Sequence, residues 1–247
     1  MTRYFYDLHI HSCLSPCADD DMTPNNIAGM AALKGLNILA LTDHNSCKNC
    51  PAFFEACRRQ GIIPIAGMEL STAEDIHIVC LFPTLDEAMK FDSEIEKHLT
   101  NIQNRPEIFG NQLILNGEDE EIGTVDELLI SATDLWIGDA VALVRKYGGY
   151  ARPAHIDRDS NGIVAILGDI PKEYGFGCFE FNSADNIEPY KRRFDFITDE
   201  SILVCSDAHR LWDINEAEYS LLIDDEPYSS ALVRQRVFEH LKKLEII

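Results

Sequence analysis

Residues Tyr4 to Ser12 read YFYDLHIHS, a short apolar run that ends on two histidines, His9 and His11. In an extended strand, side chains two positions apart point to the same face, so the two imidazoles face one point, roughly 7 Å apart at the backbone. Neutral imidazole is the commonest side-chain ligand of transition metals. Taken alone, the pair is equally consistent with one packed and one solvated histidine. As a hypothesis, this stretch is a strand that carries half of a metal site.

The same arrangement recurs along the chain, because other strand-like runs also end on side chains that bind metals. NILALT is followed by Asp43 and His44, IIPIAGM by Glu69, YARPA by His155, and ILVCS by Asp207 and His209, while His77 lies inside IHIVCLF. In a barrel of parallel strands, side chains at the carboxyl ends of the strands converge on one mouth. The recurrence therefore favours a shared metal site over scattered histidines.

The order of the predicted elements indicates an α/β fold. Strand patterns alternate with helix patterns, which is typical of a parallel sheet, and about seven such strands indicate a closed or distorted barrel. Helices are expected at about 24–35, 51–59, 85–98, 125–132, 137–147, 162–167, 188–194 and 229–244, with a late strand at 219–224. Residues 101–123 lose periodicity and are expected to form an irregular insertion. At 247 residues the whole chain, 1–247, is predicted to be one domain.

Composition narrows the class of protein and the partners. The net charge is −21, from 42 acidic and 21 basic residues. Duplex DNA is bound through several Lys or Arg contacts to phosphates, so no duplex nucleic acid is expected as a partner. A small anion or a short nucleic-acid end remains compatible with this charge as a binding partner. No apolar run reaches the roughly 18 residues of a membrane span. We expect a cytoplasmic protein without membrane contact, whose eight cysteines stay reduced.

The candidate ligands outnumber the four that one tetrahedral zinc ion takes. They suit two or three ions that share a bridging carboxylate, for which Glu69 is our choice. A mixture of imidazole and carboxylate favours zinc, manganese or iron over magnesium or calcium. Asp43 directly precedes His44, so on a strand it faces the other way and is expected to support the site. The set is His9, His11, His44, Glu69, His77, His155, Asp207 and His209, with an acid from the run 19–21 as a further ligand.

These motifs, in this order, resemble those of the PHP (polymerase and histidinol phosphatase) family of metal-dependent phosphoesterases. The motifs are DLHIHS, LTDHN, GMELS, IHIVCLF, PAHIDR and SDAH. The resemblance implies a single-domain, distorted (β/α)7 TIM-like barrel with two or three metal ions at its mouth. It also implies that His9, His11, Glu69 and Asp207 hold one ion, that Glu69, His77 and His155 hold the second, and that an early acid, His44 and His209 hold the third.

The first motif departs from the family pattern. Many relatives follow the second histidine with a short Ser-Asp-Gly, whereas this chain has the longer SCLSPCADDDMTP. Counting back from Pro24, we favour Asp19 as the early metal ligand, with Asp20 as the alternative.

The resemblance implies hydrolysis of a phosphate ester by a metal-activated water molecule. Glu69 and Asp207 would be catalytic through the metal ions they hold, and Arg158 and Arg210, which lie close to His155 and His209 in the sequence, are expected to hold phosphate oxygens. The predicted substrate is a small phosphorylated metabolite or a nucleotide. A nuclease-type phosphodiesterase acting on nucleic-acid ends, a non-catalytic metal-binding regulatory domain and an amidohydrolase-like barrel are the alternatives.

Overall fold

The central sheet of the computed structural model, which describes residues 1–245, has six strands in the order β10-β1-β2-β3-β4-β7. The last two residues of the expected domain, 1–247, lie outside the described residues. Strands β1, β2 and β3 are mutually parallel, whereas β4 is antiparallel to both β3 and β7, and β10 is antiparallel to β1. The bounds are β1 Thr2–Ile10, β2 Ile38–Leu41, β3 Ile63–Ser71, β4 His77–Phe82, β7 Tyr150–Pro153 and β10 Ser220–Ile223.

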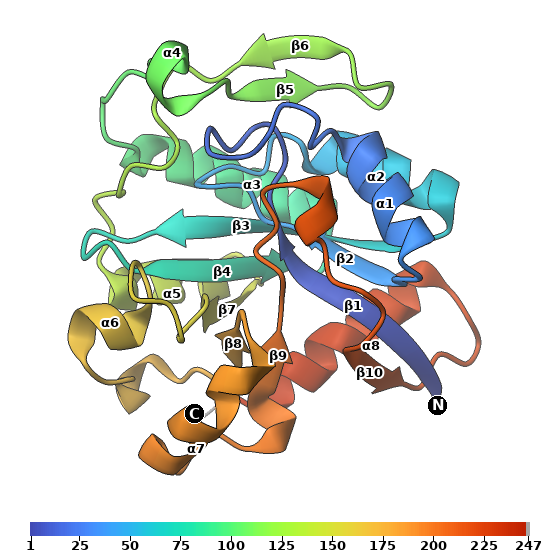
Figure 1. Cartoon of the computed structure of the whole chain (residues 1–247), viewed down its shortest axis with the longest axis vertical. Helices are drawn as coiled ribbons and strands as arrows, with labels where there is room; N and C mark the ends of the chain where they lie inside the picture. Colours follow the sequence, from blue (N-terminus) through green and yellow to red (C-terminus); the bar gives the residue numbers. More distant parts are fainter. Residues whose placement is uncertain (246–247) are drawn as a thin grey trace.

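The prediction of about seven parallel strands is therefore wrong at β4. Strand β3 ends at Ser71 and β4 begins at His77, so only residues 72–76 connect them. A parallel neighbour needs a crossover of a dozen or more residues, whereas a connection this short makes a hairpin. The alternation of strand and helix is interrupted here, and β4 turns back along β3 (Figure 1).

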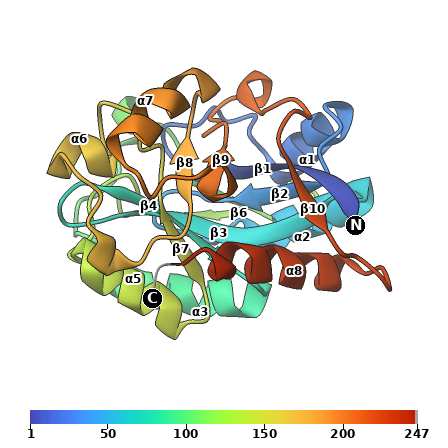
Figure 2. The same ribbon diagram turned by 90° about the horizontal axis from the view of Figure 1, so that it is seen from below.

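Two short strands continue the curl of the sheet. β8 (Phe179–Phe181) and β9 (Ile202–Val204) form a parallel pair. The backbone N–H of Ile156 donates to the carbonyl oxygen of Glu180 at 2.8 Å, and a parallel bridge joins Ile10 to Ala208. These links connect the β8–β9 pair to the β7 side and the β1 side of the sheet, which curves between its covering helices (Figure 2). The α/β fold is confirmed, while the count of seven β/α units stays a prediction.

The helices cover both sides of the sheet. Alternating side chains of the strands divide the core into two clusters, one packed against α1, α2, α3 and α5, the other against α8, which crosses the sheet beside β3 (Figure 2). No helix among residues 1–245 is long and apolar enough to cross a membrane. The bounds are α1 Pro24–Leu33, α2 Cys50–Gln60, α3 Leu85–Ile95, α4 Pro106–Phe109, α5 Ile137–Lys146, α6 Ile163–Leu167, α7 Ile187–Arg193 and α8 Ser230–Lys243, with short 3-10 turns η1 Glu96–His98, η2 Lys172–Tyr174, η3 Ala184–Asn186, η4 Asp199–Ser201 and η5 Leu211–Asp213.

The helix expected at 125–132 is absent from the described residues, which form turns there. The side chain of Gln112 binds the backbone of this segment instead. It donates to the carbonyl oxygens of Val125 and Glu127, both at 2.7 Å, and accepts from the N–H of Leu129 at 2.8 Å. Because these backbone groups already have partners, helical hydrogen bonds do not form between them.

The segment 101–123, expected to be irregular, contains α4 and a hairpin of β5 (Leu113–Leu115) and β6 (Glu121–Thr124). The hairpin lies at the edge of the molecule beyond β3 and α3 (Figure 1). Asn49 anchors it, because its side chain donates to the carbonyl oxygen of Leu113 and accepts from the N–H of Leu115. Asn49 also donates to Ser12 Oγ, so the hairpin is tied to the loop after β1.

Helix α3 begins with a capping box that the sequence pattern supports. Thr84 Oγ1 accepts from the N–H of Glu87, and Glu87 Oε2 accepts from the N–H of Thr84. Replacing Thr84 by Ala leaves the N–H of Glu87 without its side-chain acceptor, so we expect a loss of about 1 kcal/mol in the free energy of unfolding, measured in urea. Lys90→Ala, which removes only an exposed ion pair on the same helix, is the control and should cost clearly less. Equal losses would contradict the cap's role.

Candidate active site

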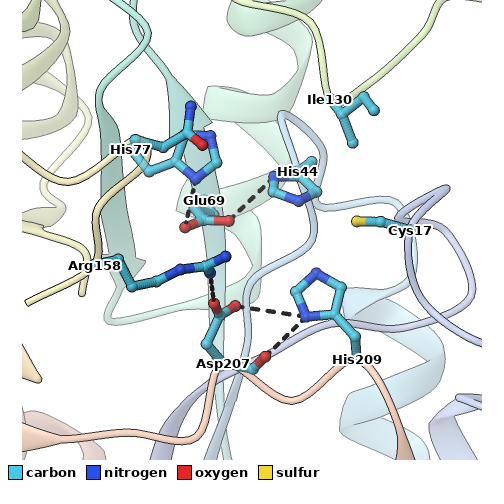
Figure 3. A pocket seen from close by; sticks show the side chains of 9 residues that line it. Cys17, His44, Glu69, His77, Ile130, Arg158, Asp207 and His209 are labelled. Atoms are coloured by element: carbon cyan, nitrogen blue, oxygen red, sulfur yellow. Dashed lines mark hydrogen bonds and ion pairs between the residues drawn. The ribbon is translucent and has the colours of Figure 1, made fainter. Parts of the chain in front are cut away.

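Five imidazoles surround the carboxylate of Glu69, which is 1% exposed. Glu69 Oε1 lies 3.0 Å from His77 Nδ1, 3.0 Å from His155 Nε2 and 3.4 Å from His9 Nε2. Glu69 Oε2 lies 3.1 Å from His44 Nδ1 and 3.3 Å from His11 Nε2. The residue predicted to bridge the metal ions is thus surrounded by predicted histidines, and Figure 3 shows it between two of them, His77 and His44.

The strand register explains this convergence. Glu69 and Ser71 lie on the same face of β3, and Ser71 pairs with His77 on β4, so Glu69 and His77 are diagonal neighbours. A parallel bridge joins His44, just beyond β2, to Glu69. His9 reaches the same point from β1. Neighbouring strands therefore place their ligands by backbone pairing.

A second buried carboxylate, Asp207, completes the cluster. Its Oδ1 lies 3.1 Å from His11 Nε2 and 3.3 Å from His9 Nε2, and its Oδ2 accepts a hydrogen bond from Arg158. The ring of His209 stacks on His11 with the centroids 4.2 Å apart. Eight of the predicted ligands are thereby brought together: His9, His11, His44, Glu69, His77, His155, Asp207 and His209.

The donor set fits bound metal ions. Three overlapping groups each offer ligand atoms within 4.8 Å of one another: His11, His44 and His209; His9, His11, Glu69 and Asp207; and His44, Glu69 and His77. Within residues 1–245, His44 Nδ1 and Asp207 Oδ1 are buried, and their 3.1 Å contacts with Glu69 and His11 lack the geometry of a hydrogen bond. Buried polar atoms without a partner are costly, and a cation would satisfy both. Imidazole nitrogen and carboxylate oxygen are suitable ligands for zinc, manganese and iron.

Two of these residues have strained backbones. His155 and Asp207 have φ angles of 23° and 52°, in or near the left-handed region that non-glycine residues rarely adopt. Such strain persists where the surrounding structure fixes it, and it gathers at functional sites. The strain therefore agrees with a functional role for both residues.

The electrostatics of the cluster favour the ligating forms of Glu69, Asp207, His44 and His209. Burial alone would lower the pKa of His9 and of His11, but the surrounding carboxylates raise the pKa of His9 above its usual value and that of His11 to about 9. Burial alone would raise the pKa of Glu69 and of Asp207, but the neighbouring histidines hold both well below the usual range. Burial and the charge of His11 lower the pKa of His44 well below its usual value and that of His209 to about 4. At neutral pH the two acids are therefore ionised, and His44 and His209 are neutral, as metal binding requires.

A buried ion pair lies behind His9. Glu180 Oε1 accepts from His9 Nδ1 at 2.6 Å, and Glu180 Oε2 accepts from Arg152 Nη2 at 2.6 Å, with both Glu180 and Arg152 fully buried. Holding Nδ1 in this way turns His9 Nε2 toward Glu69. The sequence analysis missed this pair. It could have been predicted, because Arg152 and Glu180 each lie inside a short apolar strand, β7 and β8, and buried charges are normally paired.

Asp43 supports the loop after β1, as expected from its orientation. Its carboxylate accepts from the N–H of Ser12 at 2.7 Å, from Ser12 Oγ at 2.6 Å and from Ser15 Oγ at 2.7 Å. Ser15 Oγ in turn lies 2.9 Å from His11 Nδ1. The carboxylate is thus linked to a ligand histidine through a hydroxyl group.

Two predicted site residues, Asp19 and Arg210, lie apart from the cluster, and their roles stay predictions. A 3.7 Å contact joins Asp19 to Arg210, and the side chains are 54% and 68% exposed. The N–H of Asp19 donates to the carbonyl oxygen of His209, so this loop is joined to the segment that carries His209. Among the described residues, neither lines the site cavity.

The cavity above the cluster has a volume of about 520 Å³. Arg158 lies at its mouth, where it contacts Asp207 (Figure 3). Cys17, Ile130 and Asn161 also line it, and sequence reasoning gave none of them a role there. Such residues are hard to predict from sequence, because all three lie in loops, which lack the periodic pattern of a helix or a strand. The lining is Cys17, His44, Glu69, His77, Ile130, Arg158, Asn161, Asp207 and His209.

The ion pair behind His9 makes acid unfolding testable. Burial would raise the pKa of Glu180, but the charges of His9 and Arg152 lower it to about 2. An acid whose pKa falls on folding adds stability above its ordinary pKa, here 4.5, and loses it as the pH falls toward 2. The change is about 3 kcal/mol for a shift of this size.

The measurement is urea unfolding of the metal-free protein from pH 6 down to pH 2.5, for the wild type and Glu180→Gln. The wild type should lose more stability across this range than the variant, because only the wild type carries the perturbed carboxylate. Parallel curves would contradict the assignment.

A family model described as the PHP domain matches residues 7–170, which is more than half of the chain. The chain belongs to the PHP family. The predicted membership is confirmed, and with it the prediction of a hydrolase acting on phosphate esters.

Relatives of this PHP chain act on several kinds of substrate. A 5'-3' exoribonuclease from Haemophilus influenzae is 38% identical over 79 residues, which cover 31% of this chain and 28% of that protein. A crystal structure described as a putative metal-dependent phosphoesterase from Bifidobacterium adolescentis matches with a TM-score of 0.56 at 16% identity. The match covers 94% of this chain and 95% of that protein. The chain thus spans less than a third of the exoribonuclease but nearly all of this phosphoesterase.

The lesion-specific endonuclease PfuEndoQ from Pyrococcus furiosus has a TM-score of 0.57 at 19% identity, covering 85% of the PHP chain and 49% of its own. A structure of endonuclease Q with a TM-score of 0.55, 20% identity and coverage of 85% and 50% holds a 27-mer duplex substrate with an abasic lesion at the active site. The expectation that duplex nucleic acid is excluded is therefore wrong, because proteins of this fold include one that binds a duplex. Net charge describes the whole surface, whereas a substrate meets only the mouth of the site.

Proposed function

We propose that this PHP protein is a metal-dependent phosphoesterase that hydrolyses a small phosphorylated metabolite or a nucleotide. The observation that carries the proposal is the joining of Glu69, Asp207 and their histidines at the floor of one cavity, with Arg158 at its mouth. The cavity volume of about 520 Å³ is in the range of sites for small molecules. Eight free thiols within the described part of the chain support a cytoplasmic location.

Two or three ions of zinc, manganese or iron are the proposed cofactors. Bound ions would lower the pKa of a water molecule toward neutrality and neutralise charge on the phosphate. Glu69 and Asp207, both ionised, would hold the cations through their oxygens, and His44 and His209 would offer neutral nitrogen. Arg158 has five N–H donors and uses one on Asp207, so others are free to hold a non-bridging phosphate oxygen.

A second candidate function is phosphodiester cleavage at a nucleic-acid end. The matched stretch of the exoribonuclease and the duplex held by endonuclease Q favour it. The cavity admits a terminal nucleotide by volume, so both functions use the same residues.

A substrate panel distinguishes these functions. The chelator-stripped protein is reloaded with manganese or zinc and given sugar phosphates, nucleotides with 5' or 3' phosphates, cyclic nucleotides, and single-stranded and duplex oligonucleotides. We expect the release of phosphate or nucleoside from a small substrate. Shortened oligonucleotides with intact small substrates would support the second function, and a reloaded protein that cleaves nothing would favour a non-catalytic metal-binding role.

Arg158→Gln tests the proposed phosphate contact. Loss of one preorganised donor at a reacting phosphate lowers turnover by about 100-fold, so we expect kcat/KM to fall by that order. Arg210→Gln is the matched control, because Arg210 is 68% exposed and lies outside the cavity. Steady-state kinetics on the best substrate of the panel measure both variants. An equal effect of the two changes would reject the placement of Arg158.

A further inference from the structure

The hydroxyl group of Ser15 joins three parts of the site. It lies 2.9 Å from His11 Nδ1 and 2.7 Å from Asp43 Oδ1, and it accepts from the N–H of His44 at 3.1 Å. Ser15 is fully buried. Its backbone is held by a hydrogen bond from its N–H to the carbonyl oxygen of Ser12. The hydroxyl is therefore a fixed junction between two ligand histidines and a carboxylate.

Only one arrangement of protons satisfies all the donors and acceptors around the Ser15 hydroxyl. A serine hydroxyl offers one proton and two lone pairs. The N–H of His44 can only donate, so it occupies one lone pair. The carboxylate of Asp43 can only accept, so it takes the hydroxyl proton. The contact with His11 then uses the second lone pair, which requires that His11 Nδ1 carries a proton and donates it.

We propose that Ser15 is a positioning residue that fixes the ring of His11 for metal binding. A proton on Nδ1 leaves Nε2 as the ligand nitrogen, and Nε2 is the atom that lies 3.3 Å from Glu69 Oε2 and 3.1 Å from Asp207 Oδ1. The hydrogen bonds from His11 to Ser15 and from Ser15 to Asp43 thus fix the orientation of the His11 ring, as the hydrogen bond to Glu180 fixes that of His9. This inference rests on the proposed function, because it takes His11 as a metal ligand.

Ser15 lies in SCLSPCADDDMTP, the segment in which this chain departs from the short Ser-Asp-Gly of many relatives. The same segment offers a matched control. Ser12 is equally buried and donates to the same carboxylate, at Asp43 Oδ2, but its other side-chain partners are Asn49 and Leu14, and within residues 1–245 it bonds no histidine side chain. Removing either hydroxyl costs a buried hydrogen bond to Asp43. Only Ser15→Ala removes the partner of His11.

The test compares zinc affinity in the wild type, Ser15→Ala, Ser12→Ala and Ser15→Thr, by competition of each chelator-stripped protein with a chromophoric chelator. Loss of such a supporting hydrogen bond weakens metal binding by about 10-fold to 100-fold, which we expect for Ser15→Ala. Ser12→Ala should bind zinc like the wild type even where it unfolds at lower urea, and Ser15→Thr, which keeps the hydroxyl, should recover most of the affinity.

A measurement on the wild type keeps the proposal testable if a variant does not fold. Long-range 15N–1H spectra of the zinc-loaded protein should show His11 with its proton on Nδ1 and zinc on Nε2. A proton on Nε2, or equal zinc affinity in Ser15→Ala and the wild type, would overturn the positioning role alone. A wild type that binds no zinc, manganese or iron would instead overturn the proposed function on which it rests.

Discussion

Glu69→Gln should abolish turnover and strip most of the metal from the protein. The two Glu69 oxygens face five histidines. Replacing this carboxylate by a neutral amide removes a negative charge that belongs to two of the three candidate metal-binding groups and lies next to the third. The side chain keeps its shape, so packing changes little. We expect kcat to fall by at least about 1,000-fold, because the bound ions supply both the activated water and the charge stabilisation.

The measurements are metal content by elemental analysis after reloading, and kcat on the best substrate. Glu121→Gln makes the same chemical change on the exposed strand β6 and should keep both values. Circular dichroism checks that each variant is folded. A folded Glu69→Gln protein with full metal content and activity would dismiss the bridging assignment.

Arg152→Met should be the most destabilising single change outside the metal cluster. Arg152 is fully buried and donates to Glu180 and to the carbonyl oxygen of Leu8. Its removal leaves the carboxylate of Glu180 with no compensating guanidinium. Breaking a buried pair in this way costs about 3–5 kcal/mol. Urea unfolding at pH 7 of the metal-free protein measures the loss.

The double variant Arg152→Met/Glu180→Gln is the internal control. It removes the charge that the single change leaves unpaired, so it should lose less stability than the sum of the two single variants. Additive losses would mean that the two side chains do not interact, against the 2.6 Å contact.

The clustering of the candidate metal ligands could be predicted because it obeys a local rule. His9, His44, Glu69 and His155 each follow or end an apolar run, and strand ends in such a sheet meet at one edge. A single sequence contains that information. The helices α1, α2, α5 and α8 could also be predicted, because caps and glycine stops mark their ends.

The features that could not be predicted depend on partners distant in sequence. Glu180 and Arg152 are 28 residues apart, and either charge alone would argue against a buried strand. Gln112 suppresses a helix at 125–132 through contacts that no local pattern reveals. The path of the loop that carries Asp19 depends on a hydrogen bond from its N–H to the carbonyl oxygen of His209, a partner distant in sequence that counting along the chain does not reveal.

The antiparallel pairing of β3 with β4 has a consequence for how this protein can vary. The separation of Glu69 and His77 is set by the register that pairs Ser71 with His77 across the five connecting residues 72–76. In a hairpin the length of the connection fixes the register, so a one-residue insertion or deletion there would turn His77 away from Glu69. New substrates of such a protein are therefore expected to arise from replacements within this connection or from other loops, and not from changes in its length.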